Sequence, residues 1–269
     1  MIDAELQKEL RRRYNPDGSN LRKRQLRMLE ILDYVDRVCN ENGIIYWLSS
    51  GTCLGAVRHG GFIPWDDDLD IELLEKDYKR LLTAITADKD CPYILHNHRS
   101  DKNFVLPFSK LRDPNSILNE ENGLDKDFKY RGIYIDIFPL IPSGQKWCSA
   151  VGKKLMLVCI YLTKIKNQKI KSALRKGLYN FLDSVIFPTL RSITRLKSKD
   201  QLRHQIGNPF LKARFYNDIF PLKRLDFEGR SFPIPRDPDA YLTKLYNDYN
   251  RLPDLNSIKS HSSNVEIKT

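Results

Sequence analysis

Residues 48–70 read LSSGTCLGAVRHGGFIPWDDDLD, and they are the most informative part of the chain. It joins a small glycine-containing turn to a cluster of carboxylates. In a strand over residues 68–73, alternate side chains share a face, so we expect Asp68, Asp70 and Glu72 to lie together. Neighbouring carboxylates on a half-buried strand repel each other unless a cation compensates their charge. Hard oxygen ligands at this spacing suit Mg²⁺ or Mn²⁺ bound together with phosphates.

The turn before this strand can bind an anion. Ser50, Gly51 and Thr52 follow an apolar run over residues 44–48, and backbone N–H groups in such a turn can point at a phosphate. The order strand, turn, short helix and acidic strand resembles that of the nucleotidyltransferase superfamily. The alternative is a solvated acidic turn at residues 66–68 after ordinary loop residues.

Four stretches resemble the LicD family, which includes bacterial phosphocholine transferases and the animal fukutin-related protein. The first is residues 51–70, and the others are LPFSKLRD at 106–113, RGIYIDIFP at 131–139, and FEGRSFP at 227–233 followed by Tyr241 and by YNDY at 246–249. The resemblance covers roughly residues 21–140 and 220–253. Asn247 departs from it, because the family has a glycine there.

The resemblance and the periodicity together predict an α+β protein, in which a nucleotidyltransferase-type mixed sheet is flanked by helices and joined to a helical substrate-binding region. We expect helices over the first ~40 residues up to Gly43 and at 76–87, 145–215 and 237–246. Strands are expected at 44–48, 68–73, 93–96, 104–111 and 133–138, with a hairpin at 227–232. The predicted division is a catalytic domain at 1–144, a basic helical region at 145–220, a C-terminal hairpin and helix at 221–256, and a loose tail at 257–269.

The resemblance implies a set of site residues. Asp68, Asp70 and Asp136 would be the catalytic and metal-binding carboxylates, with Asp66 as an outer ligand. Asp136 falls on an apolar strand, where burial of a lone carboxylate is costly and points to a functional role. The alternative is an aspartate at the exposed edge of the sheet. The donor phosphates would be bound by Ser50, Gly51, Thr52, Arg58, His59 and Lys110. Arg112 lies one strand step from Lys110, so both could face the same site.

The implied reaction moves a phosphoryl-linked alcohol from a CDP-activated donor to a sugar hydroxyl of a cell-surface glycan, with release of CMP. Phosphocholine, glycerol phosphate and ribitol phosphate are the candidate groups. Two alternatives stay open: a nucleotidyltransferase that releases pyrophosphate, and a non-catalytic protein that binds nucleic acid. The last is disfavoured, since the chain has no basic and aromatic recognition motif.

Composition predicts a cytoplasmic protein. Five cysteines show no paired spacing, which argues against a disulfide framework or a zinc site. Residues 1–10 lack the apolar core of a signal peptide, and the longest apolar run, at 155–162, is far shorter than the ~20 residues of a membrane span.

The formal net charge of +11 is unevenly distributed. Residues 145–230 hold 19 Lys and Arg against 5 Asp and Glu, a net of +14, which leaves −3 for the remainder. A basic segment beside an acidic one suggests an anionic partner, and nucleic acid, an anionic membrane surface and a phosphorylated glycan carrier, such as a lipid-linked acceptor, are all compatible with it. The alternative is a solvated helical face.

Overall fold

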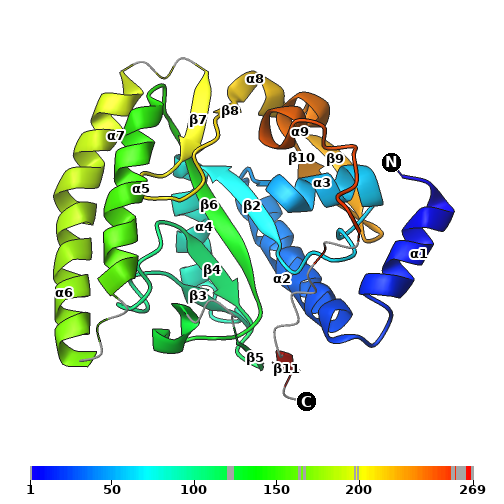
Figure 1. The fold of residues 1–269 in the computed structure, drawn as a ribbon, viewed down its shortest axis with the longest axis horizontal. Helices are drawn as coiled ribbons and strands as arrows, with labels where there is room; N and C mark the ends of the chain where they lie inside the picture. The colour runs from blue at the N-terminus through cyan, green and yellow to red at the C-terminus, as the bar shows by residue number, and fades with distance from the viewer. Residues whose placement is uncertain are drawn as a thin grey trace.

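The protein is built around one mixed sheet. The computed structural model describes residues 2–119, 124–162, 165, 168–196, 198, 200–255, 258 and 265–267. The strands of the sheet run in the order β1-β2-β6-β4-β3, with β7 paired to β6 and β8 to β7 (Figure 1). Their bounds are β1 Trp47–Leu48, β2 Asp70–Leu74, β3 Ile94–His96, β4 Ser109–Arg112, β6 Tyr134–Pro142, β7 Gln201–His204 and β8 Arg214–Phe215. The predicted α+β class is confirmed.

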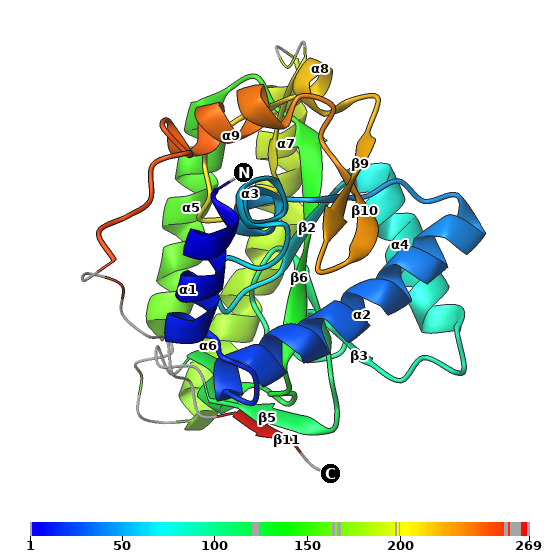
Figure 2. The same cartoon turned by 90° about the vertical axis from the view of Figure 1, so that its right-hand side faces the viewer.

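One face of the sheet is apolar and carries the main core. Side chains such as Ile71 on β2 and Ile135 on β6 alternate onto this face and are fully buried. Helices α2 (Asn20–Asn42) and α4 (Glu75–Ala87) pack against them, and Figure 2 shows α2 lying across the molecule. The opposite face carries polar side chains such as Asp70 and Asp136, together with buried aromatic rings such as Phe138.

The N-terminal residues form two helices rather than the single one expected. α1 spans Ala4–Tyr14, and α2 begins only at Asn20 because Pro16 and Gly18 lie between them. The predicted end of α2 is confirmed, since Gly43 caps it with φ +58 in the left-handed region.

Several strands differ in length from the prediction. β1 starts at Trp47 instead of residue 44, β2 at Asp70 instead of 68, and β4 at Ser109 instead of 104. β6 continues past residue 138 to Pro142, and its extension gives β7 an edge to pair with at Leu140–Pro142. A strand β5 (Ser116–Leu118) and a 3-10 turn (Leu124–Asp127) have no sequence counterpart in the prediction.

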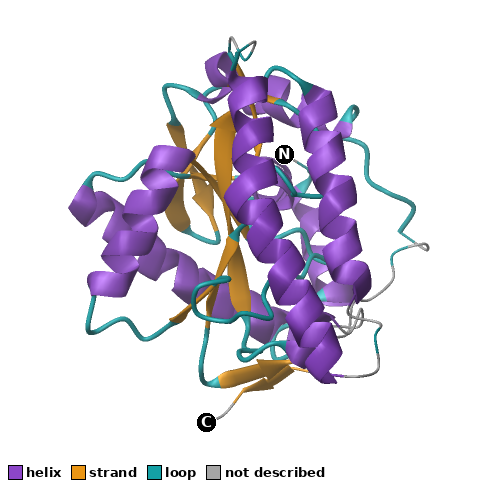
Figure 3. Cartoon of the chain, turned by 90° about the vertical axis from the view of Figure 1, so that its left-hand side faces the viewer, coloured by secondary structure: helices purple, strands orange, loops and turns teal. Residues whose placement is uncertain are grey.

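The basic region is helical only in its first part. α5 (Lys146–Tyr161), α6 (Gln168–Phe181), a π-helical turn (Leu182–Ile186) and α7 (Phe187–Arg195) confirm the helical pattern there. In Figure 1 they lie on the left, with the sheet between them and α2, and Figure 3 shows their layer from that side. The expected helix is wrong at β7 and β8, which extend the sheet instead.

The C-terminal elements follow the sequence prediction closely. β9 (Lys223–Phe227) and β10 (Arg230–Ile234) form the hairpin, turned at Glu228 and Gly229, which both have positive φ. After α8 (Tyr216–Ile219), α9 runs over Pro238–Tyr246 with Asp237 as its N-cap. The loose tail is contradicted at β11 (Val265–Ile267), which pairs with β5.

Among the described helices, none combines the length and the apolar character that crossing a membrane requires. The cytoplasmic location stays a prediction.

Candidate active site

Four polar side chains form one row across the sheet. Asp70 on β2 is the register partner of Asp136 on β6, and Asp136 is in turn the partner of Lys110 on β4. Lys110 pairs with His96 on β3. The Lys110 Nζ atom lies 2.8 Å from Asp136 Oδ1. Strand pairing therefore brings together Asp70, Asp136 and Lys110. These residues lie far apart in the sequence, and all three were predicted to belong to the site.

The carboxylates of this row carry more negative charge than the protein compensates. Burial raises the pKa of Asp70 well above its ordinary value, and the charges of Asp136 and Asp68 raise it further, while Lys110 opposes them. Burial also raises the pKa of Asp136, although Lys110 lowers it in part. For Asp66, burial and then Asp68 and Asp67 raise the pKa to about 7. Acids held in this state fit a bound divalent cation.

The acidic triplet before β2 is divided by an arginine. The carboxylates of Asp66, Asp67 and Asp68 have oxygen atoms within 4.8 Å of one another. Arg24 of α2 donates to Asp67 at 2.6 Å and lies 3.6 Å from Asp68. Asp67 is thus neutralised, which leaves Asp66 and Asp68 beside Asp70 as possible cation ligands. The sequence analysis missed Arg24, since no local motif marks a helix that packs on this loop.

Asp68 does not lie on the strand that was predicted to present it. Because β2 begins at Asp70, Asp68 belongs to the preceding loop, and its side chain is 51% exposed. Among the described residues, Asp68, Asp70 and Asp136 do not form a group as tight as the triplet. The assignment of these three as metal ligands stays a prediction.

Helix α3 (Ser50–His59) presents its N-terminus to the carboxylates. The Thr52 hydroxyl accepts a hydrogen bond from the Asp70 N–H at 2.8 Å, which joins the helix to β2. Ser50 has φ +47, a conformation that non-glycine residues rarely adopt and that often marks functional sites. At Gly51 a Cβ atom would lie only 2.9 Å from Asp66 Oδ2, so glycine allows this close approach. Ser50, Gly51 and Thr52 are therefore placed where a phosphate could bind.

Glu72, the third acidic residue of the predicted face, is structural. Its carboxylate binds Arg214 at 2.7 Å and His204 at 2.8 Å, and it accepts hydrogen bonds from Trp47 and Tyr241. Burial would raise the pKa of Glu72, but Arg214 and His204 outweigh it and hold the pKa at about 2. Sequence analysis missed these two partners, because they come from the region read as helix.

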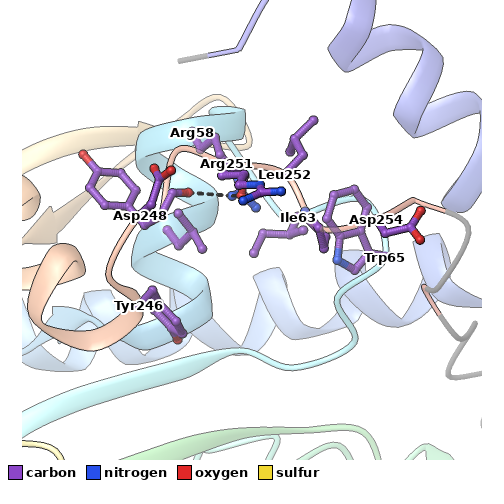
Figure 4. A pocket seen from close by; sticks show the side chains of 11 residues that line it. Arg58, Ile63, Trp65, Tyr246, Asp248, Arg251, Leu252 and Asp254 are labelled. Carbon is purple, nitrogen blue, oxygen red and sulfur yellow. Dashed lines mark hydrogen bonds between the residues drawn. The ribbon is translucent and has the colours of Figure 1, made fainter.

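Arg58 and His59 lie at the other end of α3. Arg58 donates to His59 Nε2 at 2.9 Å and to the Tyr249 carbonyl at 2.7 Å, and it lines the pocket drawn in Figure 4. Burial, Arg58 and the N-terminal amino group lower the pKa of His59 to about 3, so its ring is neutral at physiological pH. Eight residues of helix, about 12 Å, separate Arg58 from Ser50. Their role in donor binding stays a prediction.

Arg112 lies one strand step from Lys110 and makes contacts of its own. Its guanidinium donates to His96 Nδ1 and to the Gly132 carbonyl, each at 2.8 Å, and the side chain is 1% exposed. Its charge also helps to lower the pKa of Asp136, and its role at the site stays a prediction. The ring of Tyr134 contacts both Lys110 and Arg112. The distance from its centroid to Lys110 Nζ is 3.3 Å.

Comparison with known proteins gives this site a context. Residues 43–154 match the model of the LicD/FKTN/FKRP nucleotidyltransferase domain. The chain is similar to the lipopolysaccharide cholinephosphotransferase LicD of Haemophilus influenzae, with 25% identity over 260 residues, which are 90% of this chain and 95% of that protein.

Two further relatives are matched over shorter segments. The human ribitol-5-phosphate transferase FKTN is 36% identical over 63 residues, 23% of this chain and 14% of the human protein. An uncharacterized protein of Rickettsia typhi is 40% identical over 76 residues, 28% of this chain and 25% of that protein. The chain thus spans almost the whole Haemophilus protein but only a small part of the other two. Residues 43–154 are therefore identified as a nucleotidyltransferase domain of the LicD/FKTN/FKRP type.

Proposed function

We propose that this enzyme transfers a phosphoryl-linked alcohol from a CDP-activated donor to a sugar hydroxyl of a glycan and releases CMP. The observation that carries the proposal is the pairing of Asp70 with Asp136, two acids with raised pKa values side by side on one sheet face. The names of two similar proteins support the reaction class, since one is a cholinephosphotransferase and another a ribitol-5-phosphate transferase. Phosphocholine, glycerol phosphate and ribitol phosphate are the candidate groups.

A divalent cation, Mg²⁺ or Mn²⁺, fits the donor set of this site. Asp68, Asp70 and Asp136 would hold it, and Asp66 would add an outer ligand. When bound, the ion supplies Lewis-acid stabilisation of charge on the donor diphosphate. Its binding would also relieve the repulsion that raises the carboxyl pKa values.

The protein's own residues orient the donor phosphates and position Asp136, which can accept the proton of the attacking hydroxyl. The N–H groups of Gly51 and Thr52 at the start of α3 and the Thr52 hydroxyl orient the donor phosphates. Lys110 adds a positive charge and positions Asp136 through their 2.8 Å ion pair. Asp136, whose pKa is raised, either completes the cation site or accepts the proton of the attacking hydroxyl.

A product assay tests the proposal. The protein is incubated with CDP-choline, CDP-glycerol or CDP-ribitol and a glycan acceptor, with Mg²⁺ or with EDTA, and CMP is measured. We expect CMP from one donor only and only with the divalent ion. CTP in place of these donors tests the alternative suggested by the name of the matched domain: release of pyrophosphate from CTP would identify a nucleotidyltransferase.

We also propose peripheral contact between the α5–α7 layer and an anionic membrane that carries the acceptor. Of the 15 large apolar side chains exposed among the described residues, ten lie between Trp147 and Leu196. Exposed aromatic and aliphatic side chains within a basic segment favour binding at a lipid interface. The glycan acceptor would then be presented next to the sheet.

A further inference from the structure

A cavity runs along helix α3, away from the carboxylate row. Its volume is about 650 Å³, and its walls come from α3, from the loop after it and from the segment that follows α9. Leu54 and Arg58 line it from the helix, at positions that share a face with Ser50. Figure 4 shows Arg58 between Tyr246 on one side of the view and Trp65 on the other.

One end of this cavity reaches the candidate active site. Tyr246 lines the cavity, and its pKa is raised by burial and then by the charges of Asp70 and Asp66. Arg58 lies two helical turns further along α3, in the middle of the cavity. A molecule in the cavity would therefore extend about 12 Å from the carboxylates along the helix.

Arg58 carries a buried charge without an acidic partner. The side chain is 5% exposed, and among the described residues no carboxylate forms an ion pair with it. Its partners are the Tyr249 carbonyl and the neutral His59 ring, and burial alone lowers its pKa. Two other buried arginines differ, since Arg24 binds Asp67 and Arg214 binds Glu72. A buried cation without a counter-ion costs several kcal/mol and needs a reason.

The groups around Arg58 leave room for an anion. No described residue accepts a hydrogen bond from its Nη2 group, which is not completely buried. Asp248 and Asp254 line the same cavity, but both are exposed, so water reduces the effect of their charges on Arg58 without removing it. Arg251 adds a second guanidinium at the rim.

We propose that this cavity binds a phosphate group of the acceptor, with Arg58 as its buried counter-ion. A guanidinium suits this ligand because its planar fork matches two phosphate oxygens. The donor diphosphate has to lie at the carboxylate row, one helix length away, so the anion at Arg58 belongs to the second substrate. Its identity as the acceptor rests on the proposed function; the binding of phosphate itself does not.

Phosphate binding to the intact protein tests this proposal directly. Inorganic phosphate is titrated calorimetrically at constant ionic strength with EDTA, which removes cations from the carboxylates. We expect saturable binding to the wild-type protein and a loss of at least about tenfold in affinity for Arg58→Gln. Arg236→Gln is the matched control, because Arg236 is exposed and also donates to a backbone carbonyl. Equal affinity of the Arg58→Gln and wild-type proteins would overturn the proposal.

A second variant keeps the test decisive if Arg58→Gln does not fold. Asp248→Asn removes a negative charge from the exposed rim of the cavity and should tighten phosphate binding about two- to threefold. Asp226→Asn, an exposed site on β9, should leave it unchanged. An unchanged affinity in Asp248→Asn excludes the cavity as the phosphate site.

Kinetics separate this proposal from the proposed function. Arg58→Gln should raise the KM for a phosphorylated glycan acceptor and leave the KM for the CDP-activated donor unchanged. Asp70→Asn should lose turnover and still bind inorganic phosphate. If Asp70→Asn retains activity, the proposed function fails while the cavity stands. If the donor KM rises with Arg58→Gln in place of the acceptor KM, the cavity binds the donor and the acceptor assignment is wrong.

Discussion

Asp70 and Asp136 face each other across the parallel pairing of β2 and β6, and the charge of Asp136 raises the pKa of Asp70. Strand register forces this contact, because the two Cα atoms are direct partners. Lys110, the next residue along the row, offsets only part of the repulsion. The sheet therefore holds two acids in an unfavourable arrangement that a cation would relieve.

Replacing Asp70 by Asn should separate activity from stability. The substitution keeps the shape of the side chain and removes one of two adjacent charges. We expect turnover to fall by at least ~100-fold, since a bound cation contributes several kcal/mol of charge stabilisation. The melting temperature without divalent ions should rise. Activity near the wild-type value in the folded variant would contradict the assignment of Asp70.

The stability of the protein without metal should fall as pH rises. The pKa of Asp66 is about 7 in the folded protein against 3.8 ordinarily, so folding favours its protonated form. This contribution is fully present below about pH 3.8 and is lost as pH rises through 7. Asp66→Asn should therefore be more stable than the wild-type protein at about pH 8 and nearly equal to it at about pH 4. Melting curves in EDTA measure the difference in stability between the variant and the wild-type protein. A difference that does not change with pH would refute the prediction.

Membrane binding should depend on the exposed apolar side chains of the helical layer. Leu174→Glu on α6 should weaken sedimentation with anionic vesicles, because this side chain is 50% exposed. Ile45→Glu, which is 47% exposed outside that layer, is the control. Binding of the wild-type protein should weaken with salt, since exposed charges interact over about 8 Å at physiological ionic strength. No binding at low salt would leave these helices as an ordinary solvated surface.

Asn247 should be replaceable by glycine with a gain in stability. It has φ +62 and ψ −114, a conformation that favours glycine, and it is the position where the resemblance leads one to expect glycine. Relief of strain should exceed the entropy cost of glycine and leave a net gain of about 1 kcal/mol. That corresponds to a rise of about 2–4 °C in melting temperature. A lower melting temperature for Asn247→Gly would show that the asparagine side chain stabilises this turn.

Local patterns predicted the elements that depend on local interactions. Gly43 ends α2, Asp237 caps α9, and Glu228 with Gly229 turns the hairpin, as their sequence positions indicated. Asp136 was predicted on a strand because apolar residues alternate around it. That it would lie directly beside Asp70 was outside the reach of sequence, because register between distant strands is set by the whole sheet.

The basic region shows the main limit of sequence reasoning here. Its net charge of +14 suggested a positive surface, but several of its cations are paired inside the protein. Lys171 and Arg175 bind Asp127, and Arg191 and Arg195 bind Glu75. A count of charges along the chain cannot reveal such long-range pairs. The same limit explains why Arg24 and Arg214 were missed.

The ion pair of Glu72 with Arg214 has a consequence for how this protein can be recombined with its relatives. The region between β6 and β9 looks like one exchangeable insert, yet its last strands supply Arg214, which neutralises a buried acid two residues from Asp70, and His204, which hydrogen-bonds to that acid. A chimera that replaces residues 145–200 keeps both partners. One that replaces residues 145–220 risks leaving Glu72 as an isolated charge in the interior. A chimera that exchanges the helical layer should therefore place its boundary near residue 200.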